Sequence, residues 1–324
     1  MKKTHFTNRI IWICVGFFLW YVLLDGLVVS GAYKLVSGLR GRVSDGLYFV
    51  LENYSILIVS CLIFIIVCAV IKKNRFLLEV IRPTREKRSM SHFGVGILLG
   101  FLTNFFCIIC ALLHGDIKLT LDFSAEHIPL MLFALISVFF QSASEEMWCR
   151  GYLMERINVH YPLWVGIVVN AVLFGLLHIL NDGITALAMA DLIICGIAYS
   201  LLYWYSGSIW TCFGIHTMWN FTQNFLFGLP NSGLVSECSV FHLDAANGIS
   251  NWVYSYEFGV EGAIPAVFID LLLAAVILWL AKRDGRLGEL KLSKEMTGEV
   301  PVLPQDPHEE ERHIVEFPSD SSVE

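Results

Sequence analysis

The chain has 324 residues, of which 56% are hydrophobic and 16% are charged, and its formal net charge at pH 7 is −7. A mean hydropathy of +0.64 excludes an ordinary soluble domain of this length and indicates an integral membrane protein. The sequence has no basic face of the kind that would indicate a nucleic-acid partner. The partner that we expect from the composition is the lipid bilayer.

Apolar stretches approach the roughly 20 residues that an α-helix needs to cross a bilayer, whereas barrel strands would alternate over about 10 residues. The sequence therefore predicts an all-α fold, a polytopic membrane helix bundle of about eight transmembrane helices with a polar intramembrane cavity. The predicted spans are residues 10–29, 47–71 and 93–113, a fourth span that begins near residue 128, and residues 162–180, 186–205, 209–227 and 263–281. The first span is too long for the apolar region of a signal peptide, which favours a retained helix.

These spans divide the chain into five segments. Residues 1–127 hold the first three helices, 128–228 the next four, 229–262 a long extracytoplasmic loop, 263–281 the eighth helix and 282–324 an acidic cytoplasmic tail. The loop carries aromatic residues that suit a membrane interface, or it forms a lid that faces a substrate. The tail, from about residue 287 on, has little to bury, which predicts disorder.

Lysine and arginine residues predict the orientation of the bundle. They are concentrated in residues 72–91 and 282–286, whereas the loop of residues 228–262 has none. Cytoplasmic loops are enriched in these residues, so we expect a multi-pass protein of the plasma membrane with both termini in the cytoplasm. Lys34, Arg40 and Arg42, which lie in the first outer loop, depart from this rule.

Two adjacent carboxylates and an arginine interrupt the fourth span. Glu145 and Glu146 follow the uncharged run of residues 130–140, and Arg150 stands four positions after Glu146. Ionisable groups inside a membrane segment are rare and face a bundle interior or a wet cavity, so they mark a functional site. Glu146 and Arg150 also suit a simple ion pair within the helix, which leaves Glu145 without a partner.

Two later spans carry further polar groups. The fifth span contains Phe174 and His178, with Asn170 one turn earlier, and the seventh contains His216 and Asn220. A spacing of four residues places each pair on one face of its helix. A lone membrane histidine is more often a hydrogen-bonded packing residue than a catalyst, but two histidines and an asparagine near the depth of an unpaired glutamate favour one shared site.

Hydrolysis is the chemistry that suits these residue types. We expect Glu145 to act as the general base that activates water, with His178 orienting that water. His216 and Asn220 are expected to donate hydrogen bonds to the oxyanion that forms at a peptide carbonyl. This mechanism requires no cofactor. A zinc site with Glu145, His178 and His216 as ligands and water in the fourth position is the alternative, although the chain has no HExxH motif.

The three polar segments resemble the motifs of a known family, the CAAX protease and bacteriocin-processing (CPBP or Abi) family of intramembrane proteases, which is related to the Ras-converting CAAX prenyl endopeptidases. Glu145-Glu146-Met-Trp-Cys-Arg150 is similar to its EExxxR motif, Phe174-Gly-Leu-Leu-His178 to FxxxH and His216-Thr-Met-Trp-Asn220 to HxxxN. The motifs occur in the same order as in the family, and the resemblance covers residues 128–228.

The resemblance implies an eight-helix, glutamate-dependent intramembrane endopeptidase with Glu145, His178, His216 and Asn220 as catalytic residues. Glu146, Arg150 and Phe174 would support the site. Substrates in this family include prenylated CAAX proteins, so a membrane-embedded or lipidated peptide or protein is the expected partner. A non-catalytic bacteriocin-immunity or adaptor protein that uses the same cavity for binding is the alternative, and a transporter comes third because paired broken helices are not evident.

Overall fold

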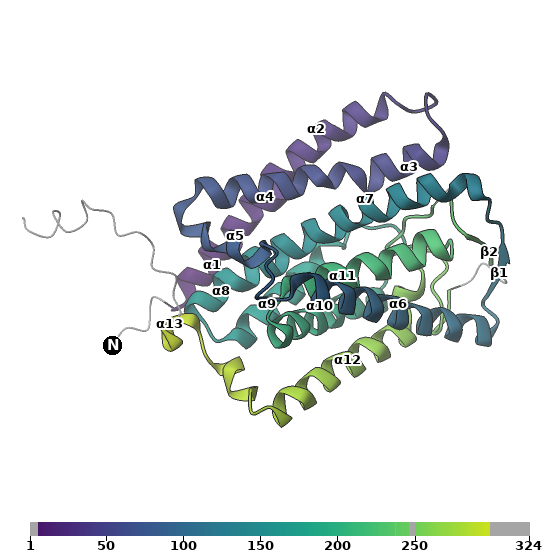
Figure 1. The fold of residues 1–324 in the computed structure, drawn as a ribbon. Helices are drawn as coiled ribbons and strands as arrows, with labels where there is room; N and C mark the ends of the chain where they lie inside the picture. Colours follow the sequence, from purple (N-terminus) through teal and green to yellow (C-terminus); the bar gives the residue numbers. More distant parts are fainter. Residues whose placement is uncertain (1–5, 237, 246–249, 299–324) are drawn as a thin grey trace, which may run out of the picture.

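The computed structural model describes residues 6–236, 238–245 and 250–298, and these form a bundle of helices with one small two-stranded sheet at one end (Figure 1). Six helices are long and apolar enough to cross a membrane: Arg9–Ser37, Asp45–Val70, Ser89–His114, Ala125–His160, Ala186–Ser206 and Ile264–Arg283. The predicted all-α polytopic bundle is therefore confirmed, whereas the predicted number of eight spans is not.

Several of these long helices are compound. The first consists of α1 (Phe6–Phe17), the π-helix η1 (Phe18–Asp25) and α2 (Gly26–Ser37); the second of α3 (Asp45–Asn53), η2 (Ser55–Leu57) and α4 (Ile58–Val70). The short elements η3 (Lys72–Asn74) and α5 (Phe76–Ile81) lead to α6 (Ser89–His114). The fourth consists of η4 (Ala125–His127), α7 (Ile128–Glu146), the π-helix η5 (Met147–Met154) and α8 (Glu155–His160). The remaining helices of the bundle are α9 (Leu163–Leu177), α10 (Ala186–Ser206), α11 (Ile209–Phe221) followed by the π-helix η6 (Thr222–Leu226), and α12 (Ile264–Arg283).

The two remaining predicted spans are helical but are not among the six. Helix α9 has 15 residues, and it ends before His178, which caps it. Helix α11 is buried at ten of its 13 positions, including His216, Thr217 and Asn220. Because α11 lies inside the bundle and packs against α6, α7 and α10, it has no lipid-facing surface that would require a purely apolar sequence.

Glycines allow α6 and α11 to approach closely. A Cβ atom on Gly96 would lie 2.2 Å from the carbonyl oxygen of Thr211, and one on Gly214 would lie 2.3 Å from that of Phe93. A side chain larger than the hydrogen atom of glycine would displace the backbone of the neighbouring helix at these positions. Close contact through small residues is typical of helix pairs in membranes. It fixes the position of the helix that carries His216 and Asn220.

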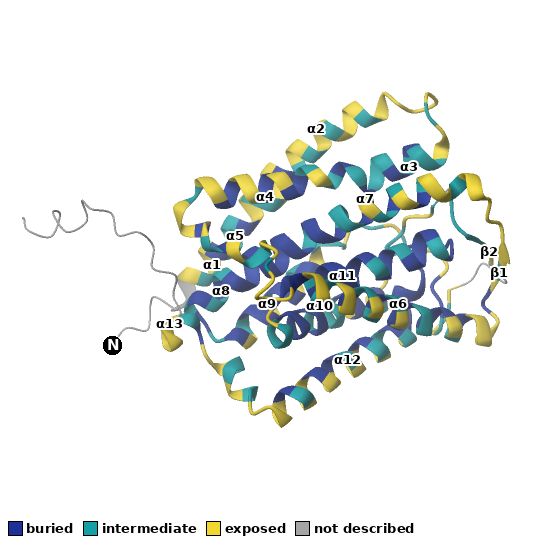
Figure 2. Ribbon diagram, viewed as in Figure 1, coloured by how far each residue is buried: buried dark blue, intermediate teal, exposed yellow. Residues whose placement is uncertain are grey.

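The outward faces of the bundle are exposed and apolar. Figure 2 shows buried residues toward the interior of the bundle and exposed residues along the outer faces of α4, α6 and α12. The exposed positions include Leu62, Ile66, Leu98, Leu102 and Leu272. A soluble protein rarely exposes so many large apolar side chains together, whereas a bilayer solvates them. The chain is thus an integral membrane protein.

The described residues of the loop 229–262, namely 229–236, 238–245 and 250–262, are folded against one end of the bundle. Its strand β2 (Phe241–Ala245) pairs in antiparallel fashion with β1 (Ile117–Leu121), so that Leu119 lies opposite Leu243. Near the start of the loop, the backbone N–H of Leu229 donates to the carbonyl of Gln223 at 2.8 Å. The loop is therefore tied to both β1 and η6, and it covers what we call the sheet end of the bundle.

The opposite end holds α8 and both ends of the described chain (Figure 1). The predicted tail differs from the structure here, because η8 (Leu287–Lys291) and α13 (Lys294–Thr297) are ordered. Lys294 pairs with Glu155, and the Arg286 guanidinium, which donates to Glu289, lowers the pKa of that carboxyl. These contacts bury part of a segment whose composition alone predicts disorder. Residues 299–324, the rest of the predicted tail, lie outside the described residues.

Candidate functional site

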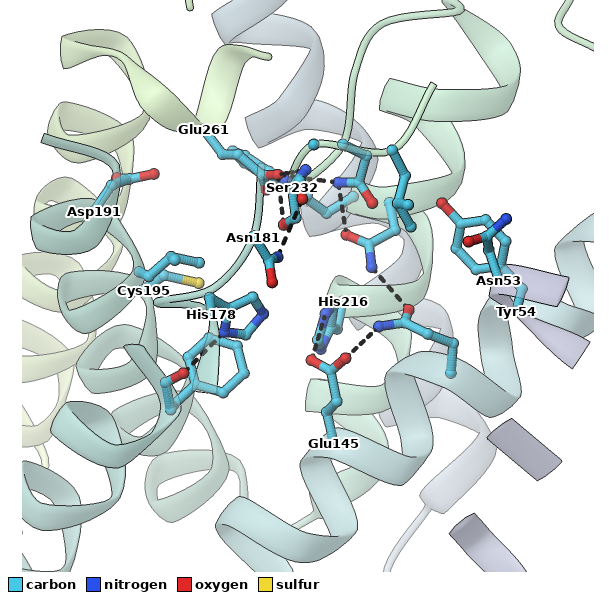
Figure 3. A pocket seen from close by; sticks show the side chains of 18 of the residues that line it. Asn53, Tyr54, Glu145, His178, Asn181, Asp191, Cys195, His216, Ser232 and Glu261 are labelled. Carbon is cyan, nitrogen blue, oxygen red and sulfur yellow. Dashed lines mark hydrogen bonds and ion pairs between the residues drawn. The ribbon is translucent and has the colours of Figure 1, made fainter. Parts of the chain in front are cut away.

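A cavity of about 350 Å³ lies inside the bundle, and residues of the loop that covers the sheet end form part of its wall; Figure 3 shows its lining side chains. Helices α7, α9, α10, α11 and α12 and the loop after η6 contribute to its wall. Five of the residues selected from the sequence line it: Glu145, Phe174, His178, His216 and Asn220. The structure therefore brings the three motifs to one place, although they lie up to 75 residues apart in the sequence.

Glu145 occupies the penultimate position of α7. Its Oε1 atom accepts a hydrogen bond from Nε2 of Gln141 at 2.5 Å. Its Oε2 atom has no hydrogen-bond partner and lies 3.8 Å from Nε2 of His216. Glu145 therefore has one carboxylate oxygen that α7 orients and one buried oxygen, beside His216, that accepts no hydrogen bond.

Glu146 and Arg150 form the predicted ion pair behind the cavity wall. Oε1 of Glu146 accepts from Nη1 of Arg150 at 3.0 Å, and both side chains are completely buried. The guanidinium also donates to the carbonyl of Gly196 and lies 4.6 Å from the centre of the Phe174 ring. These contacts give the arginine a hydrogen-bond acceptor and an aromatic face within the protein, as a buried cation requires.

Glu146 has a second role that the sequence does not reveal, because its Oε1 also accepts from Nδ1 of His216 at 2.9 Å. This bond fixes the ring so that Nε2 faces Glu145. The two adjacent glutamates thus contact the two nitrogens of one imidazole. The interpretation of Glu146 and Arg150 as an isolated ion pair is incomplete, since the pair also orients His216.

His178 contributes a ring from the end of α9. Its Nδ1 atom donates to the carbonyl oxygen of Phe174 at 2.9 Å, so the neutral ring has an unprotonated Nε2 atom. Figure 3 shows the ring between the loop side of the cavity and Glu145. His178 can therefore accept a proton or a hydrogen bond from a water molecule in the cavity.

Asn220 is held from two sides. Its Nδ2 donates to Oε1 of Gln141 at 2.9 Å, and its Oδ1 accepts from Nδ2 of Asn231 at 3.3 Å. A primary amide has two N–H groups, so one of them stays available for a ligand. Asn170, which shares a helix face with Phe174 and His178, donates instead to Ser200 and is fully buried away from the cavity.

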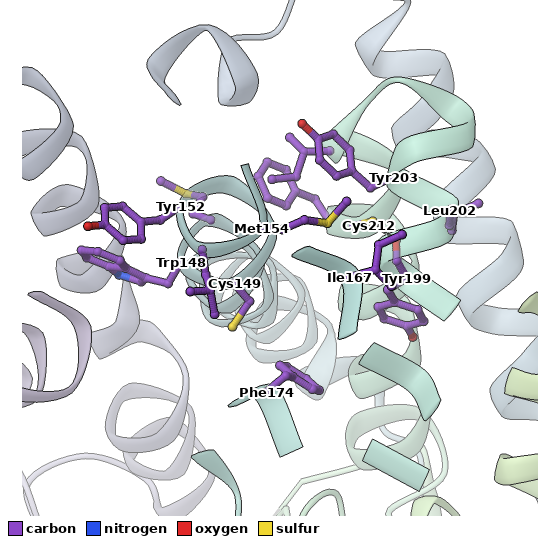
Figure 4. Packing of buried hydrophobic residues seen from close by; sticks show 14 of the residues in the cluster. Trp148, Cys149, Tyr152, Met154, Ile167, Phe174, Tyr199, Leu202, Tyr203 and Cys212 are labelled. Atoms are coloured by element: carbon purple, nitrogen blue, oxygen red, sulfur yellow. Dashed lines mark hydrogen bonds between the residues drawn. The ribbon is translucent and has the colours of Figure 1, made fainter. Parts of the chain in front are cut away.

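The helix that follows Glu146 is anchored in the largest apolar cluster of the bundle. Figure 4 shows Trp148 and Tyr152 on one side of η5 and Cys149 directed toward Phe174. Trp148 stacks on Tyr21 with ring centres 5.4 Å apart, and its Nε1 donates to Ser60. Because η5 is a π-helix, a form that is frequent at functional sites, its wider turns begin directly after the two glutamates.

The site predicted from the sequence did not include two groups of residues that line the cavity. Gln141 and Asn231 carry the hydrogen bonds that link Glu145 to Asn220 and Asn220 to the loop. Asp191 and Asp270 are buried carboxylates that also line the cavity. The aspartates were detectable from the sequence, because each is the one charged residue in an apolar stretch. The amides were not, since polar uncharged residues are common in helices and loops.

The zinc alternative requires three ligands in one cluster. Among residues 6–236, 238–245 and 250–298, no three His, Cys, Asp or Glu side chains are close enough together to hold a metal ion. All nine cysteines are free thiols. Glu145 and His216 lie beside each other, and the bond from Nδ1 of His178 to a carbonyl leaves Nε2 of that ring free to bind a metal ion or a water molecule. The zinc alternative therefore stays a prediction.

Residues 127–222 match the family model described as type II CAAX prenyl endopeptidase, Rce1-like. This segment contains all three motifs, so the resemblance to the CAAX protease and bacteriocin-processing family is confirmed. Comparisons with curated proteins and with solved structures give no match.

Proposed function

We propose that this protein is an intramembrane endopeptidase of the CAAX type in which Glu145 activates a water molecule. The family match supports protease activity at the level of the family. The observation that carries the assignment to Glu145 is its Oε2 atom, which has no hydrogen-bond partner and lies at a cavity wall beside two histidines. A general base requires a lone pair that no protein donor occupies and that lies within hydrogen-bond reach of water.

In this mechanism Oε2 of Glu145 removes a proton from water while the oxygen attacks the carbonyl carbon of the peptide bond. His178 accepts a hydrogen bond from the same water through Nε2 and orients it. When the tetrahedral intermediate collapses, the C–N bond breaks and the leaving amine takes the proton from Glu145. One carboxylate thus serves as base and then as acid, with no net change in the protein.

The oxyanion is stabilised by the groups that face Glu145. Asn220 donates through its free N–H group, and His216 donates through Nε2 when its ring is protonated. The bond from His216 to Glu146 supports this role, since the carboxylate stabilises a positive charge on the ring. Donors that are held in place before the reaction stabilise the developing charge more than mobile donors do.

The substrate is a membrane-associated peptide or protein that carries a lipid or an apolar anchor, and it reaches the cavity from the sheet end. The bundle has an apolar outer surface, and the loop that covers the sheet end supplies Asn231 and Ser232 to the cavity wall. We propose the plasma membrane, with both termini in the cytoplasm, as the location. The predicted lid role of the loop fits this arrangement.

The test uses purified full-length protein in lipid vesicles with a library of farnesylated and unmodified peptides. Glu145→Gln should abolish cleavage, by about 10⁴-fold or more, while the protein remains folded, because glutamine retains the bond from Gln141. Glu155→Gln is the matched control, a buried carboxylate of the same long helix that lies outside the cavity. Full activity in Glu145→Gln would end the proposal, and binding without cleavage in the wild type would support an adaptor.

A chelator separates the two hydrolytic mechanisms. We expect the wild type to retain its activity in an excess of EDTA or 1,10-phenanthroline, because the proposed base needs no metal ion. Loss of activity that added zinc restores would instead assign Glu145, His178 and His216 to a metal site.

A further inference from the structure

The wall of the cavity is strongly acidic. Five carboxylate side chains line it, namely Glu145, Asp182, Asp191, Glu261 and Asp270, and no lysine or arginine is present among the described residues of this wall. Glu145 belongs to the hydrolytic site, but the other four have no role in that chemistry. A cavity with charges of one sign concentrates ligands of the opposite charge.

Asp191 is the most unusual of the four. It lies on α10, is only 2% exposed, and its Oδ1 atom has no hydrogen-bond partner. The like charges of Asp270 on α12 and of Glu261 repel its carboxylate. One turn later on α10, the thiol of Cys195 donates to Asp270. Burial of a carboxylate is costly unless it is paired, so this group lacks the partner that its position requires.

Glu261 differs because the protein satisfies it. Its Oε1 atom accepts from the backbone N–H and the hydroxyl of Ser232 and from Nδ2 of Asn231. Asp182 differs in another way, since it is exposed, and it lies where the chain leaves α9. The carboxylate oxygen that lacks a partner therefore belongs to Asp191, with Asp270 beside it and Asp182 nearer to the solvent.

We propose that Asp191 and Asp270 form a subsite that binds the ammonium or guanidinium group of a lysine or arginine side chain in the substrate. This proposal rests on the proposed function, because the cation belongs to the peptide that is cleaved. Figure 3 shows Asp191 and Cys195 on one side of the cavity and Glu145 on the other, with His178 between them. A basic side chain can thus reach the aspartates while its own or a neighbouring peptide bond lies at Glu145.

The subsite also determines what is rejected. An acidic side chain that entered the cavity would meet five carboxylates and no lysine or arginine among the described residues that line it. An apolar side chain would leave Asp191 and Asp270 without a counter-charge. Selectivity of this kind comes from the penalty on the wrong ligand as much as from the attraction of the right one. The cavity therefore favours substrates with a basic residue close to the cleaved bond.

Binding can be tested without catalysis. The probes are n-butylammonium chloride and its uncharged analogue n-butanol, added to purified full-length Glu145→Gln protein, with the thermal unfolding midpoint as the readout. Sodium chloride at equal ionic strength is a parallel arm. We expect n-butylammonium to raise the midpoint and the other two additives to have no such effect. Asp191→Asn should weaken the apparent affinity at least about tenfold, because it removes one charged partner.

The matched control is Asp25→Asn, which removes a buried aspartate of η1 that does not line the cavity and should leave n-butylammonium binding unchanged. Asp191→Glu keeps the charge and should retain most of the binding. If Asp191→Asn does not fold, Asp270→Asn takes its place. Equal effects of n-butylammonium and n-butanol, equal stabilisation by sodium chloride, or unchanged binding in the aspartate variants would each overturn the proposal.

Cleavage supplies an independent arm. In the wild type, a peptide with lysine near the cleaved bond should have a KM at least about tenfold lower than the same peptide with norleucine, and Asp191→Asn should remove this difference with little change in kcat. If no peptide is cleaved, the proposed function fails while the binding arm still decides on the cation subsite. If peptides are cleaved without this preference, the subsite fails and the protease remains.

Discussion

The buried pair of Glu146 and Arg150 allows a sharp prediction about stability. Arg150→Met leaves the Glu146 carboxylate fully buried with one remaining donor, His216. Removing one partner of a buried ion pair costs about 3–5 kcal/mol, because the other charge stays uncompensated. Glu146→Gln should cost a similar amount, since the guanidinium then keeps neutral partners alone, such as the carbonyl of Gly196 and the ring of Phe174, and no counter-charge.

The double variant should be much less affected than the sum of the single variants. It removes both charges, methionine fills much of the arginine volume, and the amide oxygen of the glutamine that replaces Glu146 can still accept the bond from His216. We expect its stability to lie within about 1 kcal/mol of the wild type, as is common when an entire buried pair is replaced. The coupling between the two substitutions would then be several kcal/mol, far above the error of a double-mutant cycle.

Equilibrium unfolding in mixed detergent micelles measures these free energies. The matched control is Arg156→Met on the same long helix, whose guanidinium is only partly buried and donates to the carbonyl of Lys73; it should cost about 1 kcal/mol. The reasoning would be refuted by single variants that each cost less than about 1 kcal/mol, or by a double variant whose cost equals their sum.

Two further predictions concern the groups that position the site. Gln141→Leu should reduce kcat by about 10- to 100-fold, because Gln141 orients both Glu145 and Asn220. KM and thermal stability should change little. A change in KM alone would contradict this role. Gly214→Ala should destabilise the bundle by about 1–3 kcal/mol, because its Cβ would contact the backbone of α6. The control Gly94→Ala should be neutral, because that position has open space around it. Equal effects of the two variants on the unfolding midpoint would argue against close packing of α6 and α11.

Hydropathy was sufficient for the helices that contact lipid. Six of the predicted spans correspond to helices that are long and apolar enough to cross a membrane. The same criterion does not describe α9, which stops at His178, or α11, which carries His216, Thr217 and Asn220. The reason differs between the two helices. Helix α9 is apolar, but its 15 residues fall short of the roughly 20 that a spanning helix needs. Helix α11 is surrounded by other helices and is not selected for transfer into lipid, so its sequence does not report its depth.

The residues of the candidate site could be selected from the sequence because charge within a membrane is costly. That argument singled out Glu145, Glu146 and Arg150, and the spacing by four added the two histidine segments. The hydrogen-bond partners could not be found in this way. The bond from Glu146 to His216 joins residues 70 positions apart, and Asn231 comes from a loop whose path no periodicity predicts.

The position of α11 suits the water-dependent chemistry that we propose. The helix packs against α6 and α7, and its polar side chains find partners within the protein, as Thr217 does at the carbonyl of Phe213 and Asn220 at Gln141. Lipid-facing helices could not bear such a sequence, because each unsatisfied polar group in hydrocarbon costs several kcal/mol. The outer helices therefore serve as the apolar, lipid-facing layer, and the interior is free to be polar. An enzyme that must bring water to a peptide bond at membrane depth requires this separation.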